Sequence, residues 1–499
     1  MTRTRRIVGA VVVFLAGWST SRDAGAAGFA SAHFGGEEGS VVATNPTALY
    51  YNPAGIGFSE GIHLYLDGEI ALRSATWTHT ATPFTGEQPN SQYANTGKAA
   101  LFNVFAGPAL GTTIQLGDHL VVGAGLFVPF GGRVRFGTNS SVPTSSPSVV
   151  NGVPTGSYQG CGDPSAPVCP LAAQGVQRWH ISTAALTFLY ATVGAALRFG
   201  PLSIGAAGNF INSEISETQA HTTSNQVDST AENTASLNVQ GNNGSFAAGL
   251  MLEVVPEHLW IGGSYQAQPG LGPQTLPGTL NYNVGPAGYY SQTGSTAYKI
   301  DFHQALPDII RGGIRARIGS VELRAFGDYT RWSVMTNQCI NISTFGTECK
   351  VYGPGGGTAY PDGGDATPKG SVLTNIPRNW NNTWSARLGA SYWVKPEIEI
   401  FAGGGYETAA VPNSTLEPGA MDANNILASL GGRFMIADRF WFALSYTQIQ
   451  FQNRTVTNST LDSYVTPGTP TPTASYSESG NGQYTQWIGV VDINAEKQF

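Results

Sequence analysis

The stretch "IADRFWFALSYT", residues 436–447, joins a tight turn to a run of alternating side chains. After the turn, every second residue is large and apolar, namely Phe440, Phe442, Leu444 and Tyr446. The intervening positions combine one aromatic side chain with small ones, namely Trp441, Ala443 and Ser445. A period of two puts these sets on opposite faces of a β-strand. The stretch therefore predicts a strand with two unlike faces.

Similar extended runs recur along the whole chain, and we count fourteen of them. They lie near 62–79, 98–116, 119–137, 178–199, 202–219, 234–254, 258–268, 299–318, 320–334, 380–394, 396–411, 423–436, 438–457 and 483–499. Tight turns such as "LGDH" and "VKP" follow the even-numbered runs, whereas long loops such as 138–177, 269–298 and 335–379 follow odd-numbered ones. Short inner turns, long outer loops and an even strand number are typical of bacterial outer-membrane barrels. The pattern predicts an all-β fold, a fourteen-stranded antiparallel transmembrane β-barrel.

The composition agrees with a barrel. Charged residues make up 11% of the chain, against about 25% in ordinary soluble proteins, while aromatic residues also reach 11% and 64 of 499 residues are Gly. After the first residues there is no apolar run of about 20 residues, as a membrane helix needs. The net charge of −7 does not favour binding to nucleic acid.

Both ends of the chain carry export signals. The basic "MTRTRR", an apolar run of 12 residues and the small residues Ala24 to Ala26 predict a cleaved signal peptide over 1–26. The alternative is an uncleaved anchor. At the other end an amphipathic strand stops at Phe499, which is typical of recognition by the outer-membrane assembly machinery, although Lys497 is unusual there. We expect a location in the bacterial outer membrane.

Four cysteines form two local pairs, Cys161 with Cys169 and Cys339 with Cys349, with seven and nine residues between partners. In an exported protein, such pairs predict disulfide loops. Zinc is the alternative, but the spacing is too wide for zinc knuckles and no His lies nearby. The eight His residues are scattered, and no catalytic or phosphate-binding motif occurs. We therefore expect no metal, no cofactor and no enzymatic activity.

The stretch "ATNPTALYYNPAGIGF", residues 43–58, is irregular and apolar at once. Its two Asn-Pro steps favour turns, yet its aromatic and aliphatic side chains need burial. A compact plug inside the barrel satisfies both demands. We therefore divide the chain into a signal peptide over 1–26, a hatch over 27–61 and a barrel over 62–499.

Several segments resemble the FadL family (OmpP1/FadL/TodX type) of outer-membrane transporters for long-chain fatty acids and other hydrophobic compounds. They are "AGF" at 27–29, "YYNPAGIG" at 50–57, "GAGLFVPFGGRV" at 123–134, the hairpin containing "LPDIIRGGIRARI", and the hairpins near the C-terminus. Their order and spacing extend over more than 400 residues. The resemblance implies a fourteen-stranded barrel plugged by an N-terminal hatch.

The resemblance also implies where ligand is handled. Ala27, Gly28 and Phe29 would reach into the lumen and respond to ligand, while Asn52, Pro53 and Ala54 would support the hatch beneath the ligand site. A kink in the third strand would open a lateral exit into the membrane, and the residues expected there are Gly123, Gly125, Pro129, Gly131 and Gly132. Pro129 lacks a backbone N–H, so it belongs at a gap or a bulge. The alternatives are a frayed terminus and glycines that merely relieve crowding.

We expect passive uptake of a hydrophobic small molecule, with long-chain fatty acids first and aromatic or other hydrocarbons second. A carboxylate ligand would need a cation in the lumen, and Arg324, Arg331 and Arg387 lie in predicted strands; pairing with lumen acids is the other role open to them. The competing functions are a general aqueous porin and a surface adhesin or receptor that uses the long loops. The expected partners are the ligand, the lipid bilayer, lipopolysaccharide and the assembly machinery, and we expect a monomer.

Overall fold

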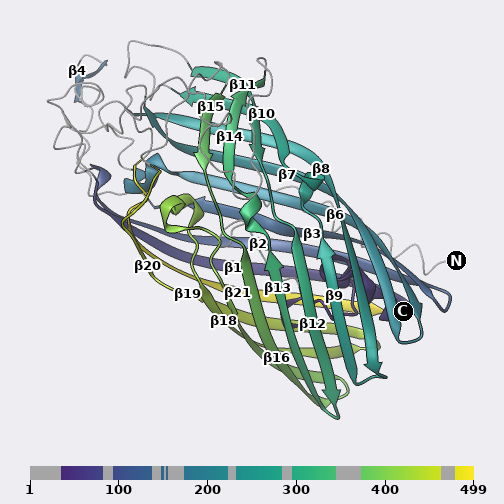
Figure 1. Ribbon diagram of the computed structural model, residues 1–499. Coiled ribbons are helices and arrows are strands. Elements are labelled where there is room, and N and C mark those ends of the chain that lie inside the picture. The colour runs from purple at the N-terminus through teal and green to yellow at the C-terminus, as the bar shows by residue number, and fades with distance from the viewer. Residues whose placement is uncertain are drawn as a thin grey trace.

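The computed structural model describes residues 35–81, 94–137, 148–150, 153–155, 174–222, 232–283, 295–343, 372–461 and 478–499. Its wall is one closed antiparallel sheet of fourteen strands (Figure 1). They are β1 (Ile62–His79), β2 (Gly97–Leu116), β3 (Leu120–Arg135), β6 (Thr183–Phe199), β7 (Leu202–Thr222), β8 (Glu232–Val255), β9 (Leu259–Gln266), β12 (Ile309–Ile318), β13 (Val321–Thr330), β16 (Thr383–Lys395), β17 (Ile398–Glu407), β18 (Asn425–Ala437), β19 (Phe440–Phe451) and β21 (Gly482–Gln498). The first strand closes the barrel because it pairs with both β2 and β21. The predicted fold class is confirmed.

Five more strands extend the wall at its outer end, where the long loops lie. They are β10 (Gln274–Asn283), β11 (Ser295–Gln304), β14 (Asn337–Ile342), β15 (Val372–Pro377) and β20 (Arg454–Val456), and β4 (Ser148–Val150) pairs separately with β5 (Val153–Thr155). Hydrogen bonds continue in the order β8, β10, β11, β14, β15, and Figure 1 shows this extension rising beyond the barrel.

One predicted strand is divided in the structure. The sequence predicts a single run over 299–318, but the chain leaves the sheet between Gln304 and Ile309. Pro307 lies in this interval and cannot donate a ladder hydrogen bond. As a result β11 belongs to the outer extension and β12 to the wall.

The two predicted faces of the strands are present. On β16, Trp384, Ala386 and Leu388 are exposed on the outside of the barrel, whereas Arg387 and Gly389 point inward. On β19, Leu444 and Tyr446 are exposed while Ala443 and Ser445 are buried. The apolar outer face suits lipid, and the closed ladder satisfies the backbone polar groups that lipid cannot. In the part of the chain that the structure describes, no helix has the length and apolar character needed to cross a bilayer.

Residues 35–61 fill the lumen with short helices. They comprise η1 (Gly36–Glu38), α2 (Ala48–Tyr51) and η2 (Pro53–Phe58), while η4 (Val176–Trp179), η5 (Pro269–Leu271), η6 (Trp332–Val334), η8 (Asn413–Thr415) and η9 (Pro418–Ala420) lie in the outer loops. The third hatch helix, η2, packs against β6, β7 and β8. All four residues of α2 are buried.

Inward-facing glycines of the wall make room for the hatch. A side chain at Gly205 would collide with the backbone of Pro53 and Ala54, and one at Gly111 would come within 2.6 Å of Pro46 Cβ. At Gly249, an added Cβ would collide with the Asn52 side chain. Part of the high glycine content is therefore explained by close approach between the wall and the hatch, since only Gly leaves this space open.

We predict that Gly205→Val displaces the hatch without opening the barrel. The added side chain overpacks the contact at a cost of about 1–3 kcal/mol. The matched control is Gly208→Val on the same strand, where nothing lies within 4 Å of an added Cβ. Limited proteolysis should cut the hatch faster in the first variant alone, while heat-modifiable gel mobility reports an intact barrel in both. Equal cleavage in the two variants would contradict the assignment.

Candidate functional site

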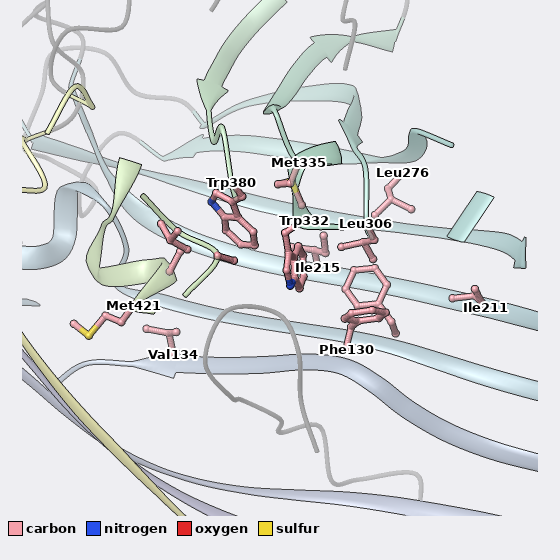
Figure 2. Packing of buried hydrophobic residues seen from close by; sticks show 14 of the residues in the cluster. Phe130, Val134, Ile211, Ile215, Leu276, Leu306, Trp332, Met335, Trp380 and Met421 are labelled. Atoms are coloured by element: carbon pink, nitrogen blue, oxygen red, sulfur yellow. The ribbon is translucent and has the colours of Figure 1, made fainter. Parts of the chain in front are cut away.

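A large cluster of buried apolar side chains lies inside the barrel, between the hatch and the outer loops. We call it the lumen cluster. Figure 2 shows part of it, labelled Phe130, Val134, Ile211, Ile215, Leu276, Leu306, Trp332, Met335, Trp380 and Met421. These residues come from β3, β7, β10 and several outer loops, so segments far apart in sequence line one apolar space.

Aromatic rings dominate the centre of the lumen cluster. Phe130 on the third strand lies 6.1 Å from Trp332, 6.3 Å from Phe188 and 6.4 Å from Tyr190, measured between ring centroids. Trp332 in turn lies 5.0 Å from Trp380. Most of these pairs are edge-to-face, an arrangement that aromatic rings prefer. The site therefore offers ring faces and edges to an apolar ligand.

The hatch forms the floor of the lumen cluster. Tyr50 lies 5.9 Å from Phe127 on β3, and the Arg311 guanidinium stands 4.6 Å above the Tyr50 ring. Leu49 is fully buried. Ala27, Gly28 and Phe29, which the sequence predicts to contact ligand, lie outside the described residues, and so does the predicted signal peptide.

Asn52 docks the hatch to the wall. Its amide nitrogen donates to Val41 O at 2.9 Å within the hatch and to Leu250 O at 3.0 Å on β8. Its Oδ1 accepts from Ala54 N at 3.2 Å, which caps η2 where Pro53 begins it. Asn52 is fully buried, so these bonds are costly to lose. These hydrogen bonds join the start of η2 to the rest of the hatch and to the wall.

The ladder between the second and third strands stops partway along. The last pair is Leu110 with Leu126, and further out the side chain of Asn103 instead donates to Arg135 O at 2.9 Å and accepts from Arg135 N at 3.0 Å. Between these points the described strands share no ladder pair, and we call this stretch the β2–β3 break. A bulge between Phe127 and Phe130 shifts the register with β6 on the other side.

The same part of the third strand loses its inside–outside alternation. Six consecutive residues, 127–132, are buried, whereas a regular strand would bury every second one. Of the predicted kink residues, Pro129 lies in the bulge and Gly131 and Gly132 follow it. Gly123 and Gly125 lie in the regular ladder instead, and an added Cβ at Gly123 would come within 3.2 Å of the hatch residue Leu49.

Arginines around the lumen are bound to carboxylates. Arg324 lies 2.9 Å from Glu322 and 3.0 Å from Glu399, and Arg331 lies 2.6 Å from Asp308. The sequence left two roles open for Arg324 and Arg331, ligand binding and pairing with lumen acids. The structure shows the second. Arg311, which the sequence analysis did not single out, lies 3.6 Å from an Asp328 oxygen. The third predicted arginine, Arg387, is buried on the inward face of β16.

A separate cavity of about 710 Å³ lies beneath the hatch, at the end of the barrel where the tight turns are. Its charged lining includes Glu322, Glu399, Glu496, Arg315, Arg317, Arg324, Arg433, His63 and His258. Hatch residues Ser40, 42–45 and 58–60 form its roof. This cavity is polar, so it is unlike the lumen cluster on the other side of the hatch.

Sequence reasoning missed Phe130, Trp332 and Asn103 as site residues. Phe130 stands between the predicted kink residues Pro129 and Gly131, which is a local signal for it. Trp332 and Asn103 stand in ordinary contexts, and the contact between Phe130 and Trp332 joins segments far apart in sequence. Of the predicted disulfide residues, Cys339 is buried on β14 and the other three lie outside the described residues.

Comparison with known proteins agrees with this architecture. A sequence profile described as outer membrane protein transport protein (OMPP1/FadL/TodX) matches residues 185–482, more than half of the chain. No curated protein matches the sequence.

Solved structures share the fold at low identity. A Pseudomonas aeruginosa FadL homologue aligns with TM-score 0.69 and 16% identity over 95% of this chain and 100% of its own. The P. putida toluene transporter TodX aligns with TM-score 0.60 and 14% identity over 95% and 99%. The Ralstonia pickettii toluene transporter TbuX aligns with TM-score 0.53 and 15% identity over 91% and 94%. The chain thus belongs to the OMPP1/FadL/TodX family of outer-membrane transport proteins, which are channels rather than enzymes.

Proposed function

We propose that this protein carries hydrophobic small molecules across the outer membrane without an energy source. Ligand binds in the lumen cluster and leaves sideways through the β2–β3 break. The observation that carries the proposal is the continuity of the cluster, which extends from the hatch residue Tyr50 through Phe127 and Phe130 of the third strand to Trp332 and Met421 in outer loops.

The charged cavity beneath the hatch supports lateral rather than axial release. A molecule that passed straight through would leave the apolar cluster, displace the hatch and cross a space lined by carboxylates and guanidinium groups. Apolar surface that leaves the cluster for such polar surroundings loses the favourable free energy of burial, about 25 cal/mol per Å². Exit through the wall keeps the ligand among apolar groups, first Phe127 and Phe130 and then lipid.

Long-chain fatty acids are our first candidate ligand, on the strength of the family resemblance. The acyl chain would occupy the cluster and the carboxylate would remain toward the outer loops and water. Monoaromatic hydrocarbons are the second candidate. Two observations favour them. The centre of the cluster is aromatic. Arg311 and Arg331 are each already paired with an Asp carboxylate, so a carboxylate ligand is not needed to neutralise them.

The direct test is uptake in a bacterial host that lacks its own transporters of this class. Labelled oleate and labelled toluene are offered separately, and we expect saturable uptake of one or both that persists after collapse of the proton gradient. Osmotic swelling of proteoliposomes in sugar solutions is the control for a general pore. Ready passage of sugars together with no hydrophobic uptake would refute the proposal.

We predict that Trp332→Ala reduces the affinity for ligand because Trp332 joins Phe130 to Trp380 in the cluster. Truncating a buried Trp typically costs about 3–5 kcal/mol of packing, and a loss of roughly tenfold or more in apparent affinity should follow. Trp384→Ala is the matched control, since Trp384 is 50% exposed on the outside of the barrel. Equal effects of the two substitutions would argue against ligand binding at the cluster.

Deleting Pro129 tests the lateral exit. Removal of one residue from the bulge should let the third strand straighten and pair with β2, because two β3 residues there stand opposite one residue of β6. We expect uptake to fall at least tenfold while ligand still binds. Pro129→Ala keeps the residue count and is the control for the loss of proline alone. Normal uptake by a folded deletion variant would exclude this route.

The predicted processing has its own test. We propose cleavage after Ala26 and disulfides between Cys161 and Cys169 and between Cys339 and Cys349. Intact mass of the purified protein should fit a mature chain that begins at Ala27 and carries four fewer hydrogens than the reduced form. Free thiols that react with a maleimide under denaturing conditions would contradict the pairing.

A further inference from the structure

The segment between β17 and β18 is a loop whose two ends are tied together. Asp422 Oδ2 accepts hydrogen bonds from Ala410 N at 2.6 Å and from Val411 N at 3.0 Å. Arg454 bridges the same ends by donating to Val411 O and Asp422 O, both at 2.8 Å. Compact surface loops of this length whose ends lie close together are frequently functional. We call residues 411–422 the β17–β18 lid.

The underside of this lid belongs to the lumen cluster. Leu416 and Met421 are almost completely buried, and Figure 2 includes Met421 among the cluster residues. Gly419 lies over Ile181, close enough that an added Cβ would stand 3.4 to 3.6 Å from that side chain. Among the described segments, the lid thus covers apolar surface that a ligand arriving from outside needs to reach.

The tip of the lid is fastened by charge. Glu417 pairs with Arg378, which follows β15, and its second oxygen lies 3.3 Å from His180 Nδ1, which precedes β6. Burial raises the pKa of Glu417, but Arg378 and His180 lower it further, to about 2. Glu417 stays ionised at neutral pH, and three separate segments meet at this one carboxylate.

The ion pair at the tip is compatible with an outward swing of the lid, although Thr415 Oγ1 also donates to Arg378 O at 2.6 Å. Breaking a buried ion pair in place is costly because each charge is left without a partner. The Glu417 side chain is already 13% exposed and that of Arg378 8%, so an outward swing would bring both into water. The same swing would expose the apolar underside of the lid and the cluster beneath it to water, unless a hydrophobic ligand covered them. A hydrophobic molecule therefore favours opening more than water does.

We propose that the β17–β18 lid is the outer gate through which ligand reaches the lumen cluster, with Glu417 as its latch on Arg378 and His180. The proposal rests on the function proposed above and adds to it the segment that moves. It concerns access from outside, whereas the β2–β3 break concerns release.

A reversible crosslink tests the gate. In the double variant Ile181→Cys, Gly419→Cys, the ideal Cβ at position 419 lies 3.6 Å from Cβ of residue 181, within the range of about 3.5–4.5 Å for disulfides. We expect uptake to fall at least tenfold after oxidation and to recover on reduction. The single variants and the wild type, each with and without reductant, are the controls. A fully crosslinked protein that transports at the wild-type rate would overturn the proposal.

The same experiment separates failure of the gate from failure of the proposed function. The reduced double variant has a free lid, so absence of hydrophobic uptake there and in the wild type would refute the function itself. Normal uptake in both states, with the crosslink verified by mass spectrometry, would refute the gate alone. Unchanged heat-modifiable mobility shows that the barrel is folded in each state.

Glu417→Gln tests the latch. Removing the charge should increase hydrogen exchange at the lid amides severalfold and should not slow uptake. Glu397→Gln is the matched control, because Glu397 is exposed in the turn between β16 and β17. Unchanged exchange in the lid, or uptake slower than in the control, would contradict a latch at Glu417.

Discussion

Every backbone N–H and C=O of a membrane-spanning strand needs a partner within the protein, because lipid offers none. Closure of the sheet between β1 and β21 meets this demand for the wall as a whole. At the β2–β3 break, the backbone groups are satisfied in a different way. There the third strand bends inward so that residues 127–132 are buried by protein, and the Asn103 amide takes over as partner of the Arg135 backbone. The break is therefore an ordered part of the wall that the Asn103 side chain stabilises.

The hatch is held against the same wall by close packing and by side-chain hydrogen bonds, and not by strand pairing. Glycines at 111, 205 and 249 let its backbone and the Asn52 side chain approach closely, while Asn52 supplies hydrogen bonds to both the hatch and β8. Because Tyr50 also packs against Phe127, the hatch contacts the third strand just where its regular pairing ends. Floor and break are thus parts of one packed unit.

Much of the fold was predictable because it follows from short-range periodicity. The faces of β16 and β19 can be assigned from alternation alone, and a stretch as irregular and apolar as residues 43–58 required an enclosing structure. Other features depend on distant contacts that no local pattern encodes. Pro307 gave a local signal, yet the division of the run over 299–318 follows from where β11 finds its partners. The contact between Phe130 and Trp332 joins residues about 200 positions apart, and the ion pairs of Arg324 depend on the register of three strands.

The distribution of charge in the lumen supports the proposed lateral route for an apolar molecule. Above the hatch, aromatic and aliphatic side chains form one cluster, and the arginines beside it are neutralised by Asp308 and Asp328. Below the hatch, the cavity is lined by carboxylates, guanidinium groups and two histidines. A ligand that binds above gains free energy by leaving water and would give it up again by continuing downward. Beside Phe127 and Phe130, the described residues of β2 and β3 share no ladder pair, and beyond this part of the wall lies lipid. In the proposed function, binding and lateral release both rest on this separation of apolar and charged surfaces.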